Sequence, residues 1–556
     1  MKTFKFSIII ALCSVIICGC SKKSVTNSHL VAVPDNAAIV LSINAKQIIE
    51  KAGLNNPDQY KVYKLLQQEI EGAPAEEAKI IKDFLKDTRT SGLNLDNIFL
   101  YLALTDDSEN AEPYYGAVFL IDNLKTFENF LGKAKLSDDI ESRLIHLPDG
   151  ISTVQWNDEI AVISNAAGYG IDVFNKDEAK SILANELFKT DYSGKNDLYL
   201  YAECNLFLLN ILKQMSYYTV PMENAMLKSL EAYKDMSMSV SIDSEKGEFA
   251  ANVTLLPVEK ATELFKKFYR TDFNSNLYRY ISDKSLMAVK FAIKPLDIYN
   301  QYKKNIGMDK TGETAETTTE QVEILDDQGN VTDEEEVIID KYSGYTSRYD
   351  LAQKMMIEQY DAQITSILEN FTGDFIGSLS GITNITVPDF AIAAGIVEGK
   401  ENDITALIEQ VGFVKNSDGY HSLEIQNMNF YFAVNKNIAY LTGTPEAIAK
   451  FFDKGYSSDI TSAKNFGKEL KDALSYFYLN INVNDYPALL KTFIAMSQEG
   501  SMVMPLLEKL KSISISSVNM NSGGLKIKLN DSDYASKVIL KEIDKLASEY
   551  FSDRIY

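Results

Sequence analysis

Hydrophobic and polar residues alternate along many short segments of this chain, and such a period of two predicts β-strands. The clearest examples are residues 35–43, 154–164, 236–242 and 247–255, and segments with helical spacing follow several of them. Strands that alternate in this way suit an antiparallel sheet with helices packed on it. The pattern therefore predicts an α+β fold that is mainly antiparallel sheet with packed helices.

The alternating pattern occurs twice in the same order. Residues 35–43 match residues 283–291, 248 positions later, and residues 154–164 match residues 432–442 at an offset of 278. Three further matches follow in the same order: 198–201 with 476–479, 236–242 with the strand that begins at residue 513, and 247–255 with 524–529. Five ordered matches predict an internal duplication into two homologous halves, residues 30–272 and 273–556.

The larger offset of the later matches predicts an insertion in the second half. Residues 309–341 contain twelve Asp or Glu residues and two Lys residues, a net charge of −10. Such a segment cannot bury enough apolar area to fold by itself. We expect an exposed acidic loop or loose hairpin at about 309–341.

Composition narrows the possible functions. Of the 556 residues, 46% are hydrophobic and 24% are charged, which is typical of a folded globular protein. The 78 acidic residues outnumber 55 Lys and Arg residues, giving a net charge of −23, so we expect no nucleic-acid partner. Four Cys and three His residues leave little material for a metal site, and we expect no metal and no cofactor.

The first twenty residues have the pattern of an export signal. Lys2 and Lys5 precede an apolar run that is shorter than the roughly 20 residues needed to span a bilayer. The run ends in Ile17-Cys18-Gly19-Cys20, which resembles the lipobox of bacterial lipoproteins. That resemblance implies a signal peptide over residues 1–19, lipidation of Cys20 and a tether over residues 20–29. The basic residues after Cys20 favour a periplasm-facing outer-membrane lipoprotein, although surface exposure stays open.

Few residues are candidates for catalysis. Cys204 shares a strand face with apolar neighbours and is expected to be a buried core thiol, with no His nearby in sequence to activate it. His29, His146 and His421 are isolated from one another, and His29 falls in the expected tether. We therefore predict no catalytic residue and no metal ligand.

Pairs of acidic residues and exposed tyrosines are the features that would support other functions. Asp106-Asp107, Asp138-Asp139 and Asp326-Asp327 could serve a hydrolase only if two carboxyls faced each other across a cleft. Among the 31 Tyr residues, Tyr114-Tyr115 and Tyr217-Tyr218 are the best candidates for exposed rings that stack on sugars or anchor a partner. These features leave a polysaccharide hydrolase and a glycan-binding protein as alternatives.

Several motifs together resemble one protein family. The lipobox, the segment Val33-Pro34-Asp35-Asn36-Ala37, the segment Lys51-Ala52-Gly53-Leu54 and the two-copy layout look like an uncharacterised family of Bacteroidetes lipoproteins, domain of unknown function 4836. The resemblance implies no known activity and no catalytic residues. We expect a cell-envelope protein without enzymatic activity that binds or scaffolds an unidentified protein or glycan and is held to the membrane through Cys20.

Overall fold

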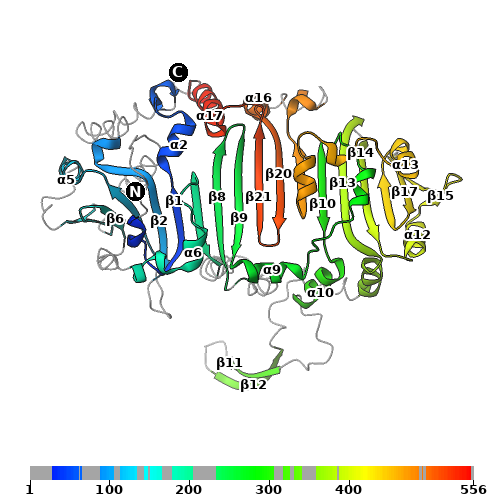
Figure 1. The fold of residues 1–556 in the computed structure, drawn as a ribbon. Helices are drawn as coiled ribbons and strands as arrows, with labels where there is room; N and C mark the ends of the chain where they lie inside the picture. The colour runs from blue at the N-terminus through cyan, green and yellow to red at the C-terminus, as the bar shows by residue number, and fades with distance from the viewer. Residues whose placement is uncertain are drawn as a thin grey trace.

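The computed structural model describes most of the chain beyond its first 27 residues. The described residues are 28–61, 63–64, 88–104, 113–133, 143–147, 151–165, 178–204, 233, 235–305, 317–325, 331–340, 359–384, 387–426, 428–486, 491–492, 496 and 498–552. They form one long antiparallel sheet with helices on both faces and a separate hairpin (Figure 1). The predicted α+β class is confirmed.

The first half contributes one arm of this sheet. In spatial order its strands are β4 (Leu144–His146), β5 (Thr153–Trp156), β6 (Ile160–Ser164), β3 (Pro113–Ile121), β2 (Leu93–Leu104), β1 (Ala37–Ile43), β7 (Leu198–Glu203), β8 (Ser237–Glu245) and β9 (Glu248–Leu256). The strands expected at 35–43, 154–164, 236–242 and 247–255 are all present, and 154–164 forms the expected hairpin.

The second half contributes an arm with the corresponding strand order. Its strands are β15 (Val414–Lys415), β16 (His421–Ile425), β17 (Met428–Asn435), β18 (Ile438–Thr442), β14 (Val387–Ile396), β13 (Phe371–Asn384), β10 (Met287–Ala292), β19 (Ser475–Asn480), β20 (Leu510–Asn519) and β21 (Ser522–Leu529). Apart from the short β15, each strand has a counterpart in the first arm, in the same neighbour relationships. The common ancestry of the halves stays a prediction, which this shared order supports.

The two arms join edge to edge. Strand β9 pairs with β21 from Ser522 opposite Thr254 to Lys528 opposite Glu248. Each strand would otherwise be an unpaired edge, which invites aggregation. The junction therefore makes a single sheet of the two arms.

Helices cover the sheet unevenly. They are α2 (Ala45–Ala52), α5 (Leu124–Lys133), α6 (Glu186–Asp191), α9 (Val258–Lys266), α10 (Pro295–Asn305), α12 (Glu401–Gln410), α13 (Pro445–Phe452), α14 (Gly467–Asp472), α16 (Gln498–Leu507) and α17 (Ala535–Ser552). Short 3-10 helices are η1 (Ser28–Ala32), η2 (Pro57–Gln59), η3 (Thr88–Ser91), η5 (Glu178–Lys180), η6 (Ile182–Ala184), η7 (Ser275–Tyr280), η9 (Ile460–Ser462) and η10 (Val483–Asp485). Figure 1 shows α16 and α17 at one end of the central strands and α9 at the other.

Local sequence accounts for several of the helix starts. The Asn44 side chain accepts a hydrogen bond from the Gln47 N–H and so caps α2. Thr444 caps α13 in the same way, and Pro445 occupies the first helical position, where no N–H is needed. These caps fix where the chain leaves the sheet.

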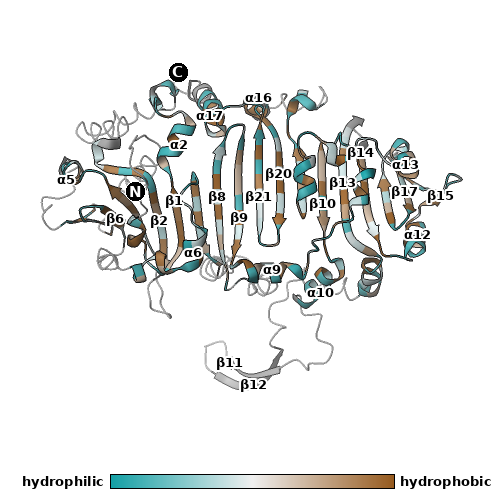
Figure 2. Cartoon of the chain, viewed as in Figure 1, coloured by the Kyte–Doolittle hydropathy of each residue, from teal (hydrophilic) through white to brown (hydrophobic). Residues whose placement is uncertain are grey.

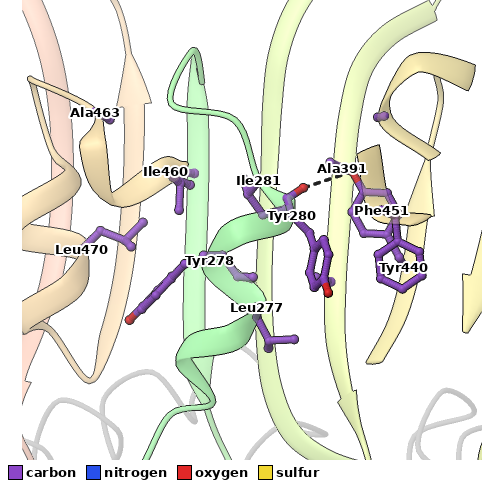
Figure 3. Close-up of a cluster of buried hydrophobic side chains, with 14 of the residues drawn as sticks. Leu277, Tyr278, Tyr280, Ile281, Ala391, Tyr440, Phe451, Ile460, Ala463 and Leu470 are labelled. Atoms are coloured by element: carbon purple, nitrogen blue, oxygen red, sulfur yellow. Dashed lines mark hydrogen bonds between the residues drawn. The ribbon is translucent and has the colours of Figure 1, made fainter. Parts of the chain in front are cut away.

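Buried tyrosines mark one face of both arms, which we call the tyrosine face. In the second arm Tyr440 stacks on Phe451 and its hydroxyl donates to the Tyr280 carbonyl oxygen (3.1 Å; Figure 3). In the first arm Tyr201 is fully buried against Phe188 of α6. The two main cores of the protein lie on this face.

One sequence match is wrong by a single residue. Ser42 lies opposite Tyr199, and Lys290, its match at the offset of 248, lies opposite Tyr476. Tyr476 therefore corresponds to Tyr199 rather than to Leu198. Their hydroxyls confirm this, since Tyr199 donates to Asp191 of α6 (2.8 Å) and Tyr476 donates to Glu469 of α14 (2.9 Å).

The acidic insertion contains a hairpin of its own. Strands β11 (Thr317–Leu325) and β12 (Val331–Asp340) pair only with each other among the described strands. Figure 1 shows this hairpin apart from the main sheet. A hairpin is thus present within the expected insertion, while its predicted turn at 328–330 lies outside the described residues.

Candidate functional site

A continuous row of apolar residues crosses the sheet on the face opposite the tyrosines. Residues directly opposed on neighbouring strands project to the same side. The row runs through Ile98, Ile43, Leu198, Ile242, Ala251, Leu525, Ile515, Phe477, Val289, Gly377, Ile392, Leu441 and Phe432. We call it the apolar row.

The row is buried at its ends and exposed in its centre. Ile43 and Phe432 are 4% and 6% exposed, whereas Ile515 is 52% exposed and Ile242 and Leu525 are both 37% exposed. Figure 2 shows the same alternation of hydrophobic and hydrophilic residues along the central strands. An exposed apolar patch in a folded protein commonly marks a binding surface. The centre of the row, residues Ile242, Ala251, Leu525 and Ile515, is therefore a candidate binding surface.

A small cavity adjoins this surface at the junction of the arms. It has a volume of about 260 Å³ and lies between β9, β21 and the end of α9. Val253 and Leu255 line it from the first arm, and Leu474 and Gly523 line it from the second. Both arms are thus needed to form it.

A second, more apolar pocket lies on the same face in the second arm, beside α10. Its volume is about 330 Å³, and we call it the α10 pocket. Its lining is almost wholly apolar: Phe291, Ile293, Pro295, Leu368, Phe371, Gly373, Phe375, Ile392, Ala394, Phe432, Ala439 and Leu441, with Asp374. The Asp374 carboxylate already accepts hydrogen bonds from Arg270, Thr372 and the Asn274 N–H. The pocket therefore offers a ligand mainly apolar contacts, and the carboxylate in its lining is already hydrogen-bonded within the protein.

Sequence reasoning did not identify this pocket. Its residues come from strands, from α10 and from the helix that contains Leu368, and none belongs to a motif identified in the sequence. A signal existed in the internal repeat, because the repeat allows each strand position of one arm to be compared with its match in the other. That comparison needs the strand pairings, which only the structure supplies.

A polar cavity of about 320 Å³ bears on the hydrolase alternative, because two carboxylates line it. Asp283 and Asp485 both line it. The Asp283 carboxylate accepts from the Ser458 hydroxyl (2.8 Å), and the Asp485 carboxylate accepts from the Asn480 side-chain amide (2.8 Å). The pairs 106–107, 138–139 and 326–327, singled out from the sequence, lie outside the described residues.

Cys204 is a buried core residue, as predicted. It is 6% exposed and packs with Met236 and Ala261. Burial raises the pKa of its thiol, and the nearby Glu203 acts in the same direction. A thiol in this setting is a poor nucleophile.

The three histidines lie on separate elements. His29 is wrongly assigned to the tether: it is fully buried in η1, where Nε2 lies 2.8 Å from the Asn97 carbonyl oxygen and burial lowers its pKa to about 4. The His29 ring packs on Phe99 of β2, so this residue is part of the folded body. His146 lies on β4, and His421 on β16 lies 3.1 Å from Glu409. Within the described ranges no three His, Cys, Asp or Glu residues gather as a metal site.

The exposed tyrosines expected from the sequence are found only in part. Tyr115 is 56% exposed, but its neighbour Tyr114 is 6% exposed and its hydroxyl donates to Asn36 (2.9 Å). The alternation along β3 forces this difference, since adjacent strand residues point to opposite faces. Tyr217-Tyr218 lies outside the described residues, as does Cys20.

No helix in the described part of the chain is long and apolar enough to cross a membrane. No curated protein matches the sequence. A solved structure titled "Structure of crystal form IV of TP0453" is similar over 45% of this chain and 89% of that chain, at 11% identity and a TM-score of 0.25, and this value supports no conclusion about fold or function. A family model described as "Domain of unknown function (DUF4836)" matches residues 30–332, more than half of the 556 residues. The chain therefore belongs to the family of domain of unknown function 4836.

Proposed function

We propose that this protein is a lipid-anchored protein of the bacterial cell envelope that binds a hydrophobic molecule, such as the hydrocarbon part of a lipid, without catalysing a reaction. The observation that carries the proposal is the exposed centre of the apolar row, where Ile515 is 52% exposed and Ile242 and Leu525 are 37% exposed. Covering aliphatic surface contributes about 25 cal/mol for each Å² removed from water. A surface without charges at its centre favours a hydrophobic ligand over a glycan.

The chemistry of the candidate residues supports a binding role. Cys204 is buried, and His29, His146 and His421 lie on three different elements. The polar cavity with Asp283 and Asp485 keeps a carboxylate hydrolase as the alternative. If the protein is not such a hydrolase, the double variant Asp283→Asn, Asp485→Asn and the wild type should release sugar from envelope polysaccharide at the same rate.

The binding surface can be tested with a hydrophobic fluorescent probe. The protein without its leader and anchor, residues 21–556, is titrated with bis-anilinonaphthalene sulfonate. Ile515→Asp places a charge in the centre of the row and is expected to weaken probe binding at least five-fold. Ser516→Asp adds the same charge on the opposite face of β20 and serves as the matched control. Equal binding by both variants would overturn the proposed surface.

The anchor and the envelope location have their own test. The lipobox-like segment ending at Cys20 supports lipidation. Expressed with its leader, the protein is expected to fractionate with membranes and to incorporate labelled palmitate, and Cys20→Ala should abolish both. A Cys20→Ala protein that still incorporates palmitate would contradict the proposed anchor. Separation of inner and outer membranes, with protease treatment of whole cells, then tests the periplasm-facing placement in a Bacteroidetes host.

A further inference from the structure

We propose that the α10 pocket binds the hydrocarbon chain of an anionic amphiphile. This inference rests on the proposed function and assigns it a second, separate site with a defined ligand class. It follows from a comparison of the same place in the two arms, which is filled by the protein itself in one arm and left open in the other.

In the first arm this place is filled by large side chains. Ile49 of α2 is 1% exposed and packs with Ile43, Ile98 and Phe119. Ile43 lies opposite Ile98, and Phe119 lies opposite Ala161. Helix α2 thus closes the sheet face with its own aliphatic residues.

In the second arm the corresponding strand positions hold different side chains. Phe291 lies opposite Phe375, in the place of Ile43 and Ile98, and the two rings stack at 4.7 Å. Ala394 lies opposite Ala439, in the place of Phe119 opposite Ala161. The exchange of a phenyl ring for a methyl group removes the side chain that fills the site in the first arm.

Helix α10 does not replace the missing volume. It follows β10 as α2 follows β1, but of its residues only Pro295 lines the pocket, while Ile298 and Tyr302 are 36% and 40% exposed. The resulting pocket of about 330 Å³ is about twice the ~150 Å³ of an apolar cavity that stays dry and takes benzene. A hydrocarbon chain fits such a pocket, because the chain needs no hydrogen-bond partner.

A basic groove next to the pocket suits the head group. Ile293 and Pro295 line the pocket, and Lys294 between them lines a groove of about 520 Å³. Lys266, Lys267 and Lys304 also line this groove, against two acidic residues, Glu263 and Asp297. Lys294 Nζ donates to the Lys266 carbonyl oxygen (2.7 Å), which places its ammonium group at the end of α9. In a chain of net charge −23 this local excess of positive charge favours a carboxylate or phosphate head.

Dodecanoate is the probe for the first test, with binding to residues 21–556 measured by isothermal titration calorimetry. Ala394→Phe restores the ring that the first arm carries and is expected to weaken binding at least ten-fold. Ala250→Phe makes the same change on β9, on the face opposite the apolar row, where Ala250 lies between Asp243 and Lys526, and is the matched control, expected to leave the dodecanoate affinity unchanged. Dodecanoate binding by Ala394→Phe at the wild-type affinity would overturn the proposed site.

A milder variant keeps the test valid if Ala394→Phe fails to fold. Ala394→Cys adds only a sulfur atom, and dodecanoate is expected to slow its alkylation by a maleimide at least ten-fold. Unchanged alkylation at saturating dodecanoate would overturn the site. Dodecyltrimethylammonium tests the head group: it should bind more weakly than dodecanoate, and Lys294→Gln should reduce the difference. Equal affinity of the two amphiphiles for the wild type would overturn the role of the basic groove.

The failure of this inference can be told from the failure of the proposed function. If Ile515→Asp abolishes dodecanoate binding and Ala394→Phe leaves it intact, the central surface is the binding site and the α10 pocket is not. If neither dodecanoate nor the fluorescent probe binds the wild type, both proposals fall. Dioctanoylphosphatidate identifies the source of the chain, since tighter binding than dodecanoate indicates a phospholipid and weaker binding a free fatty acid.

Discussion

Phe119 and Ala394 occupy equivalent places in the two arms of the sheet, each directly opposite an alanine of the neighbouring strand, Ala161 and Ala439. Phe119 is 5% exposed and fills its site, whereas Ala394 lines an open pocket. The two arms therefore share a strand order and differ in whether this site is closed by the chain itself.

Phe119→Ala should create a pocket in the first arm like the α10 pocket of the second arm. Removing a buried phenyl ring costs about 3–5 kcal/mol, since the contacts are lost and the cavity collapses only in part. Urea unfolding followed by circular dichroism measures the change. Tyr115→Ala on the same strand is the control, because Tyr115 is 56% exposed and its loss should cost less than about 1 kcal/mol. Equal losses for the two variants would contradict the equivalence.

The buried ion pair between Lys51 and Asp197 should contribute more to the free energy of unfolding than exposed ion pairs do. Lys51 Nζ lies 2.9 and 3.0 Å from the two carboxylate oxygens of Asp197, which also accepts from the Ser244 N–H. Lys51→Met leaves this carboxylate buried without its cation and should cost about 3–5 kcal/mol at pH 7. Lys260→Met breaks the exposed pair with Asp235 and should cost less than about 1 kcal/mol.

The cost of Lys51→Met should depend on pH. Burial raises the pKa of Asp197, and the Ser244 N–H and Lys51 oppose this rise. Without Lys51 the folded-state pKa rises further, so the folded variant binds a proton more readily than the unfolded chain. Its free energy of unfolding should therefore fall as pH rises from about 4 to 7 relative to the wild type. A cost that is the same at pH 4 and pH 7 would show that Lys51 acts by packing alone.

The titration of Lys290 should make the free energy of unfolding rise as the pH becomes mildly alkaline. Lys290 is 2% exposed, and its ammonium group donates to the carbonyl oxygens of Leu470, Lys471 and Ala473 at the end of α14. Burial lowers its pKa to about 8, against the opposing effect of Asp472, while the unfolded value is about 10.4. Between these values the unfolded chain binds more protons, so the free energy of unfolding rises with pH.

Comparison with Lys290→Met isolates this contribution. The wild type should gain stability over the variant as pH increases from 8 to 10, as measured by urea unfolding at each pH. Lys284→Met removes an exposed lysine six residues away and is the matched control. A flat difference for Lys290→Met would show that burial does not lower the pKa of Lys290 in the folded protein.

The thiol of Cys204 should react slowly in the folded protein. In residues 21–556 it is the sole cysteine, and it is buried with a raised pKa. Its reaction with dithiobis-nitrobenzoate at pH 8 should be at least roughly 100-fold slower in buffer than in 6 M guanidinium. A fast reaction in buffer would make Cys204 a candidate nucleophile after all.

The alternation of residues along the chain was enough to predict the strands, the α+β class and the hairpin at 154–164, because a period of two is a local property of an exposed or half-buried strand. The acidic composition of 309–341 likewise predicted a segment outside the body. The burial of Cys204 followed from its place beside apolar strand residues. His29 was misjudged because a polar neighbourhood in sequence does not reveal that its ring packs on Phe99, a residue of β2.

Alternation does not determine which strands pair or in which register. The candidate site depends on both, because its residues come from strands that are distant in sequence. The match of Tyr476 to Leu198 instead of Tyr199 is an error of one residue that reverses the face of the strand. The junction of β9 with β21 brings Ala251 beside Leu525 and so places the exposed centre of the apolar row across the two arms. The amino-acid sequence by itself determined local periodicity and the two-copy pattern. Only the tertiary structure decided which side chains fill the sheet faces, because pairing between distant strands depends on the packing of the whole protein.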